Sequence, residues 1–382
     1  MSVLKTILIS VAVVLVLVVV LAGVGFTILL SNFGLAPRQA FEVYREQQRV
    51  AAAIHNAEAP IDSPDAVSDA GFVNIGGIEQ WITIRGKNRK NPALLFLHGG
   101  PGDAQSQLAY IYRRWEESFK VVQWDQRGAG RTYGRNGSAT PDMTLERIIE
   151  DGLEVAEHVR TRLGKRKVIL VGHSWGSVLG VSMVMRRPEL FSAYVGTGQI
   201  VSWAGQMPQE YAYTLARLEA DHEEDGIKDL SRLGPPPYRT LQEDERMRKW
   251  LNRYLPDADK TYLLASVMLA MRNSKYSLKD VQDKQTGHLS FSLPRMHSIY
   301  SDIDLNVLSH QIPIPFFVID GREDRITPPE LAADYLQKIA APQKGMELID
   351  GAGHFAVMSH SEEFLRILLA KLGPIADTSR TE

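Results

Sequence analysis

The pattern of hydrophobic and polar positions changes character twice along the chain. Residues 6–30 carry no charged side chain and are almost entirely apolar. Residues 57–71 are small, polar and proline-containing, as is typical of a linker. Beyond residue 71, short apolar runs alternate with segments of helical period. This arrangement predicts a domain of alternating strands and helices.

Residues 6–30 are long enough to cross a membrane as one helix. At about 1.5 Å per residue the segment would extend ~37 Å, and a hydrocarbon core is ~30 Å thick. A signal peptide has a shorter apolar region of about 7–15 residues. We therefore predict an uncleaved single-pass anchor. The alternatives are a signal peptide cleaved near "VLA" at 20–22 and a buried helix. Lys5 and the amino terminus precede the segment, whereas Arg38 and Arg45 follow it together with Glu42 and Glu46, so we expect an extracytoplasmic main domain.

Several short apolar runs are typical of strands. One alternates like a half-exposed strand, at 79–86, and three are nearly continuous, at 93–99, 119–125 and 167–172. Uninterrupted, β-branched runs bounded by glycine suit parallel strands that are covered on both faces. Buried-strand patterns return late in the chain, at 312–319 and 345–351.

Helical periods lie between and after these runs. Residues 144–163 carry one apolar stripe, and Gly164 stands where a helix C-cap is expected. From 201 to 300 the strand pattern stops, and amphipathic helical segments occur at 208–224 and 241–255. Later helices are expected from residue 328 and from 361 to about 371. Strand–helix units interrupted by a helical block predict an α/β sheet with an inserted lid.

We expect six segments along the chain. They are a transmembrane anchor, a juxtamembrane helix with a linker, the first part of an α/β core, a helical cap, the second part of the core, and a short tail. Their predicted ranges are 1–35, 36–70, 71–200, 201–305, 306–375 and 376–382.

The amino-acid composition excludes only a few classes of function. The 382 residues are 44% hydrophobic and carry a formal net charge of −2, so no nucleic-acid partner is expected. The chain has no cysteine. This excludes disulfides, thiolate catalysis and cysteine-ligated metals, and leaves the redox compartment open.

The most informative stretch is "VGHSWGS" at 171–177. Residues 172–176 fit the pattern G-x-S-x-G between a predicted strand and a predicted helix. That context is typical of a nucleophile elbow, a strained turn that lifts a serine hydroxyl above the sheet. We therefore predict that Ser174 is a nucleophile, with a plain glycine-rich turn as the alternative. A serine hydroxyl needs a base to take its proton and a third group to orient that base.

The acid and the base should follow the serine in that order on such a sheet. The loop 320–330 follows a predicted strand, and we choose Asp324 as the acid because it can point from the loop. Asp320, at the strand end, is the alternative. His354 lies in a glycine-bearing loop between the last predicted strand and the last helix, and is the predicted base.

Two further loops follow buried strands. In "LHGGPG" at 97–102, the backbone N–H of Gly100 can join that of Trp175 in an oxyanion hole. We expect His98 to organise this loop rather than to act as a base. In "WDQRGAGRT" at 124–132, Asp125 and Arg127 can pair and brace the rim of the site, with direct substrate contact as the alternative.

Three motifs in order, HGGPG at 98–102, DQRGAGR at 125–131 and GHSWGS at 172–177, resemble the proline iminopeptidase branch of the α/β-hydrolase superfamily. The resemblance covers roughly residues 71–375. It implies an eight-stranded, mostly parallel sheet flanked by helices, with a helical cap. It also implies a triad of Ser174, Asp324 and His354, an oxyanion hole at Gly100 and Trp175, and no metal or organic cofactor.

The resemblance also implies a substrate class. Members of that branch release N-terminal residues, often proline, from peptides, and acidic cap residues hold the free amine. The tryptophan–glutamate pair of the family's cap is absent here, since Trp250 is followed by Leu251. Glu210, Glu219 and Glu223 are candidates for the amine contact, although glutamates on helix surfaces are usually solvated.

We therefore expect a membrane-anchored serine hydrolase that cleaves an amide in a short peptide or small molecule. An esterase or lactonase, an acyltransferase with the same triad, and a non-catalytic binding module are the alternatives. The substrate itself, the cap residues that touch it and the oligomeric state are not predicted.

Overall fold

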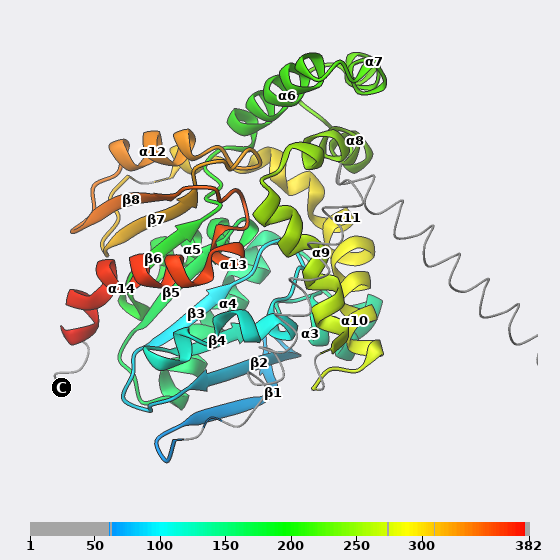
Figure 1. Cartoon of the computed structure of the whole chain (residues 1–382). Helices are drawn as coiled ribbons and strands as arrows, with labels where there is room; N and C mark the ends of the chain where they lie inside the picture. The colour runs from blue at the N-terminus through cyan, green and yellow to red at the C-terminus, as the bar shows by residue number, and fades with distance from the viewer. Residues whose placement is uncertain (1–60, 62, 273–274, 309, 379–382) are drawn as a thin grey trace, which may run out of the picture.

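A computed structural model describes residues 61, 63–272, 275–308 and 310–378 of the protein (Figure 1). The predicted anchor at 6–30 and the predicted juxtamembrane helix lie outside the described residues. Within the described ranges, no helix is both long and apolar enough to span a membrane.

Eight strands form one sheet in the order β1-β2-β4-β3-β5-β6-β7-β8. The pairs β1–β2 and β2–β4 are antiparallel, and all other neighbours are parallel. The predicted eight-stranded, mostly parallel sheet is therefore confirmed. The strands are β1 Val67–Ile75, β2 Ile78–Gly86, β3 Ala93–Leu97, β4 Lys120–Trp124, β5 Val168–His173, β6 Phe191–Thr197, β7 Phe316–Gly321 and β8 Lys344–Ile349.

Helices flank this sheet and follow its strands. The α-helices are α3 Gly130–Asn136, α4 Leu145–Arg162, α5 Trp175–Arg186, α6 Trp203–Ala220, α7 Glu224–Leu233, α8 Leu241–Leu251, α9 Asp257–Arg272, α10 Leu278–Gln285, α11 Leu293–Met296, α12 Pro329–Lys338, α13 Ala356–Ser359 and α14 Ser361–Thr378. Shorter helical segments are η1 Ser106–Tyr112, η2 Trp115–Glu117, η3 Gly137–Ala139, η4 Pro188–Leu190, η5 Asn252–Tyr254, η6 Thr286–Ser292, η7 His297–Asp302 and η8 Leu305–Val307.

The central strands are buried on both faces, as their continuous apolar runs predict. On β3, Leu95 and Leu97 pack into one hydrophobic cluster together with Val155 of α4. Leu94 and Phe96, which point the other way, belong to a second cluster that includes side chains of α14. Because successive residues of a strand face opposite sides, a run without polar residues fills both clusters at once.

The first strand corrects the predicted linker at 57–71. β1 begins at Val67, inside that range, and runs along the edge of the sheet, where it pairs only with β2. Most of its residues are exposed or half-buried. An edge strand with one neighbour needs few apolar side chains, so its sequence has the small, polar character of a linker.

A block of helices, α6 through η8, lies in sequence between β6 and β7, and we call residues 203–307 the cap. Figure 1 shows α6, α7 and α8 above one end of the sheet, and α10 beside α3. The helix α8 begins with a capping box in which Thr240 and Glu243 bond each other's backbone N–H groups. The predicted limits of the anchor, core and cap segments are not tested and remain predictions.

Candidate active site

Ser174 lies at the tight turn that joins β5 to α5. Its φ of +52° falls in the left-handed region, which residues with a side chain rarely adopt. The flanking glycines are required by close packing. A Cβ at Gly172 would lie 2.5 Å from the carbonyl oxygen of Gly176, and one at Gly176 would lie 2.2 Å from that of Leu97. The pattern G-x-S-x-G therefore allows α5 to start directly against β3 and β5.

The predicted acid and base meet beside this turn. His354 Nδ1 lies 2.9 Å from Asp324 Oδ2, and both side chains are buried. Ser174 and His354 line the same cavity of about 800 Å³. The three residues come from loops after β5, β7 and β8, so the carboxyl ends of parallel strands bring them to one edge of the sheet. Their catalytic roles remain predictions.

The carboxylate of Asp324 accepts hydrogen bonds from its own loop. Its Oδ1 accepts hydrogen bonds from the backbone N–H groups of Ile326 and Thr327, both at 2.8 Å. Its Oδ2 accepts the Thr327 hydroxyl at 2.6 Å. Burial alone would raise the pKa of Asp324, but His354 and the Thr327 bonds outweigh it and hold that pKa below its usual range. An ionised Asp324 can therefore fix the orientation of the His354 ring.

The alternative acid, Asp320, has a different environment. It is fully buried at the end of β7, and its Oδ1 accepts the backbone N–H of Gly198 at 2.5 Å. Burial, followed by the nearby charge of Asp324, raises the pKa of Asp320 well above its usual value. Its bond to Gly198 fixes the loop after β6, while Asp324 is the carboxylate that contacts His354.

The loop after β3 borders the same cavity through Gly99 and Gly100. Gly100 has a φ of +117°, which only glycine adopts easily. Trp175 is the first residue of α5, and the N–H groups in the first turn of a helix have no partner within the helix. Trp175 directly follows Ser174, and Gly100 lines the same cavity as Ser174; an oxyanion hole at these two residues remains a prediction.

His98 organises this loop. Its Nδ1 donates to the carbonyl of Gly99 at 2.8 Å, and its Nε2 accepts the backbone N–H of Gln126 at 3.2 Å. The Gln126 side chain donates back to the carbonyl of His98 at 3.1 Å. Burial lowers the pKa of His98 to about 4, so the ring is neutral and ties the loops after β3 and β4 together.

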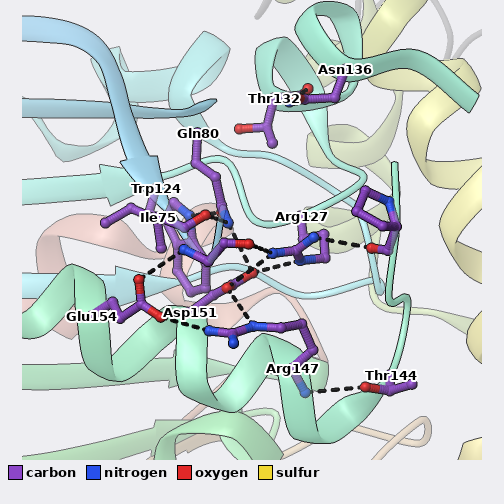
Figure 2. Close-up of polar contacts among 12 residues, drawn as sticks. Ile75, Gln80, Trp124, Arg127, Thr132, Asn136, Thr144, Arg147, Asp151 and Glu154 are labelled. Carbon is purple, nitrogen blue, oxygen red and sulfur yellow. Dashed lines mark hydrogen bonds and ion pairs between the residues drawn. The ribbon is translucent and has the colours of Figure 1, made fainter. Parts of the chain in front are cut away.

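The predicted ion pair between Asp125 and Arg127 is wrong, because each of the two residues has another partner. Arg127 pairs with Asp151 of α4, at 2.7 Å from Nε to Oδ2, and both side chains are fully buried (Figure 2). Asp125 instead accepts the backbone N–H of Arg131 at 2.9 Å and so holds the start of α3. Burial raises the pKa of Asp125 to about 6.

A network around Asp151 braces the loop after β4. Gln80 of β2 donates to Asp151 at 2.8 Å and accepts from the indole of Trp124 at 2.7 Å (Figure 2). Arg127 also donates to the carbonyls of Gly76 and Pro141, at 2.9 and 3.0 Å. Arg127 thus has a scaffold role: its side chain joins the loop after β4 to the β1–β2 turn, to the segment before α4 and to Asp151 within α4.

The three glutamates considered for amine binding lie in different places. Glu219 is exposed, and Glu223 pairs with Arg253 at 2.8 Å. Glu210 on α6 is fully buried, and its Oε1 lies 3.2 Å from both Arg248 and Gln206, two residues that line the cavity. Its Oε2 has no hydrogen-bond partner among the described residues. Burial raises the pKa of Glu210 to about 8.

Sequence reasoning missed one of the acids that line the cavity, Asp244 of α8. Asp244 lines the cavity wall, and its Oδ1 lies 3.5 Å from Arg248 Nε, without a hydrogen bond among the described residues. The signal was present in the sequence. Asp244 shares the buried face of α8 with Met247 and Leu251, at helical spacing. Because an acid is rarely buried without a partner, an acid at such a position indicates a polar contact or a functional role.

The remaining lining of the cavity is mixed. Aliphatic and aromatic side chains of the core and the cap line much of it, among them Ile200, Trp203, Leu241, Leu263, Leu289, Leu293, Tyr300 and Phe355. Within the described parts of the chain, no group of three or more His, Asp or Glu side chains is arranged to hold a metal ion.

Comparisons with known proteins agree with the fold described above. A family model described as alpha/beta hydrolase fold matches residues 92–361. A probable aminopeptidase of Bacillus subtilis is 30% identical over 298 residues, which cover 74% of this chain and 89% of that protein. A proline iminopeptidase of Saccharolobus solfataricus is 22% identical over 310 residues, covering 78% and 91%.

Solved structures show the same fold. A proline iminopeptidase-related protein from Thermus thermophilus superposes with a TM-score of 0.56 at 21% sequence identity, over 81% of this chain and 99% of that one. A bacterial membrane phospholipase A superposes with a TM-score of 0.52 at 17% identity, over 92% and 97%.

Proposed function

Because the chain belongs to the α/β-hydrolase family, in the branch that includes the proline iminopeptidases, we propose that this hydrolase is a serine aminopeptidase acting on short peptides. The observation that carries the proposal is the contact of the buried Asp324 with His354, which lines the same cavity as Ser174. The similarity to an aminopeptidase and to a proline iminopeptidase supports an N-terminal residue as the group that is released.

In this proposal the cleaved carbonyl sits between Ser174 and the loop after β3. His354 takes the proton from Ser174 as the hydroxyl attacks, and the ionised Asp324 stabilises the imidazolium that forms. The N–H groups of Gly100 and Trp175 stabilise the oxyanion. His354 then protonates the leaving amine, and water releases the acyl group by the same steps in reverse.

The free amine of the substrate would be held by acids of the cap. Glu210 and Asp244 each have one carboxylate oxygen without a hydrogen bond among the described residues. Arg248 contacts both carboxylates, so once Glu210 is ionised, above its pKa of about 8 or beside a bound ammonium group, two negative charges face a single positive one. A peptide ammonium group would supply the missing donors and restore the charge balance.

An esterase is the second candidate, because the cavity is rich in aliphatic side chains. Leu241, Leu263, Leu289 and Leu293 line its wall and suit an acyl chain as well as a proline ring. If the enzyme is an esterase, Arg248 neutralises the charge of the cap acids, so that an uncharged substrate can bind in the cavity.

Hydrolysis of three substrates by the full chain separates the two candidates. They are proline p-nitroanilide, its N-acetyl derivative and p-nitrophenyl butyrate. We expect kcat/KM for the free amine to exceed that for the blocked amide by about 10- to 100-fold, because an unpaired charged contact costs ~1.5–3 kcal/mol. Equal turnover of the two amides, with faster cleavage of the ester, would instead support the esterase.

The matched variants are Asp244→Asn and Glu219→Gln. The first should raise KM for proline p-nitroanilide and leave the blocked amide unchanged, since only the free amine contacts the acid. The second changes an exposed residue of α6 and should leave both substrates unaffected.

We also infer that residues 6–30 anchor the enzyme in a membrane as a single-pass helix, with the catalytic domain on the extracytoplasmic side. The length of this uncharged segment supports the inference.

A further inference from the structure

The end of the sheet opposite to Ser174 carries positive charge that catalysis does not use. A cavity of about 660 Å³ lies there, where β4 begins and β2 ends. Its charged lining consists of five cations and one acid, namely Arg85, Arg89, Lys120, Arg162, Lys275 and Asp69. We propose that this cavity is a binding site for a phosphate-bearing anion.

Lys120 is the central observation. The residue borders the cavity although it is only 1% exposed. Its Nζ donates to the backbone carbonyl of Arg89 at 2.8 Å, and no carboxylate lies within ion-pair distance of it among the described residues. An ammonium group has three N–H donors, and a buried lysine is normally paired with an acid. Two donors of Lys120 are therefore available to a ligand.

A second lysine adds to the unbalanced charge. Lys165 precedes β5, and its Nζ donates to the carbonyl of Lys90 at 2.9 Å. Burial, followed by the nearby charge of Lys165, lowers the pKa of Lys120 to about 7. Two ammonium groups that repel each other without an intervening carboxylate would be stabilised by a bound anion.

The arginines of the cavity are only partly neutralised. Arg85 pairs with Glu116 at 2.8 Å, and Arg162 pairs with Asp69 at 2.9 Å. Arg89 is exposed and forms no ion pair with another described residue. The cations therefore still outnumber the acids when both carboxylates are counted.

The chemistry of these groups favours phosphate. Guanidinium groups bind phosphate oxygens through two parallel N–H bonds, and lysines add compact positive charge. Such an anion can be a soluble phosphate or the headgroup of an anionic phospholipid. Ile61, the first described residue, also lines the cavity.

The test uses the full chain in a neutral detergent at constant ionic strength. Binding of inorganic phosphate, of short-chain phosphatidylglycerol and of short-chain phosphatidylcholine is measured by calorimetric titration. We expect saturable binding of one or both anionic probes and none of phosphatidylcholine. Binding of inorganic phosphate identifies a soluble ligand, whereas binding of phosphatidylglycerol alone identifies a lipid headgroup.

Two variants remove cations of the cavity, and each should weaken binding about tenfold or more. Lys120→Met keeps the apolar stem of a buried side chain, and Arg89→Gln changes an exposed residue that forms no ion pair within the described part of the chain. The control, Lys228→Gln with Arg232→Gln, removes two exposed cations of α7. The proposal is overturned if neither anion binds saturably, if phosphatidylcholine binds as well, or if Arg89→Gln binds like the control.

Discussion

Thr327 is a small residue on which the geometry of the proposed catalytic pair depends. Its hydroxyl donates to Asp324 at 2.6 Å and lies 3.1 Å from the ring of His354. Thr327→Val keeps the shape of the side chain but removes this donor. We expect kcat for proline p-nitroanilide to fall about tenfold with little change in KM, because the carboxylate and the ring lose their alignment.

The matched control is Thr327→Ser, which restores the hydroxyl and should restore most of kcat. A Thr327→Val enzyme as active as the Thr327→Ser enzyme would show that this hydrogen bond has no part in positioning the pair.

Glu210 couples the stability of the fold to pH. Burial raises its pKa to about 8 in the folded chain, whereas an unfolded glutamate titrates near 4.3. Between these values the folded state binds more protons than the unfolded state, so Glu210 makes stability fall as pH rises from about 4.5 to 8. Glu210→Gln should flatten this dependence in urea unfolding at about pH 5 and pH 8, and Glu219→Gln should not. The same slope in both variants would contradict the assignment.

At the scale of elements, the loop after β4 is held by a buried ion pair. Removing one partner of such a pair leaves an uncompensated charge, which costs about 3–5 kcal/mol. We therefore expect Arg127→Met to lower the free energy of unfolding by about 3 kcal/mol, since Arg147 and Gln80 still contact Asp151. Denaturant unfolding of the variant measures this loss.

The double variant Arg127→Met with Asp151→Leu should lose less stability than the two single changes added together. A surface control, Arg186→Met, disrupts an exposed pair with Glu146 and should cost under about 1 kcal/mol. Equal losses in Arg127→Met and Arg186→Met would mean that the buried network does not brace the loop.

The sequence predicts strands correctly where a segment is buried on both faces. The runs at 93–99 and 167–172 became β3 and β5, and Gly164, with a φ of +59°, follows the end of α4 as expected. The prediction was poor at the edge, because β1 has one neighbour and few apolar contacts. The partner of Arg127 was missed because Asp151 lies on a helix, 24 residues away, and only packing brings the two together.

At the scale of the whole molecule, the predicted acid and base could be chosen from the sequence because parallel strands end at one edge. The loops after β5, β7 and β8 therefore converge at this edge, independently of how the cap packs. Asp244 could not be placed in this way. Its position depends on how α8 packs against α6 over the cavity, and short-range sequence patterns do not specify the packing of two cap helices.

The proposed anchor is tested on the intact chain. We expect the protein to stay in the membrane fraction after an alkaline carbonate wash. Val16→Arg with Val18→Arg should release it, because each arginine near the centre of a spanning helix costs about 2.5–3.5 kcal/mol. Release of the unmodified chain, or a mature N-terminus near residue 22, would contradict an uncleaved anchor.

The most direct test of the proposed chemistry is covalent labelling of the folded chain with a fluorophosphonate, read by intact mass and peptide mapping. We predict one adduct, on Ser174, that is absent in Ser174→Ala. Its formation should slow about 10³-fold or more in His354→Ala, because the hydroxyl loses its base. No adduct on the folded protein, or an adduct on another residue that persists in Ser174→Ala, would contradict a nucleophilic Ser174.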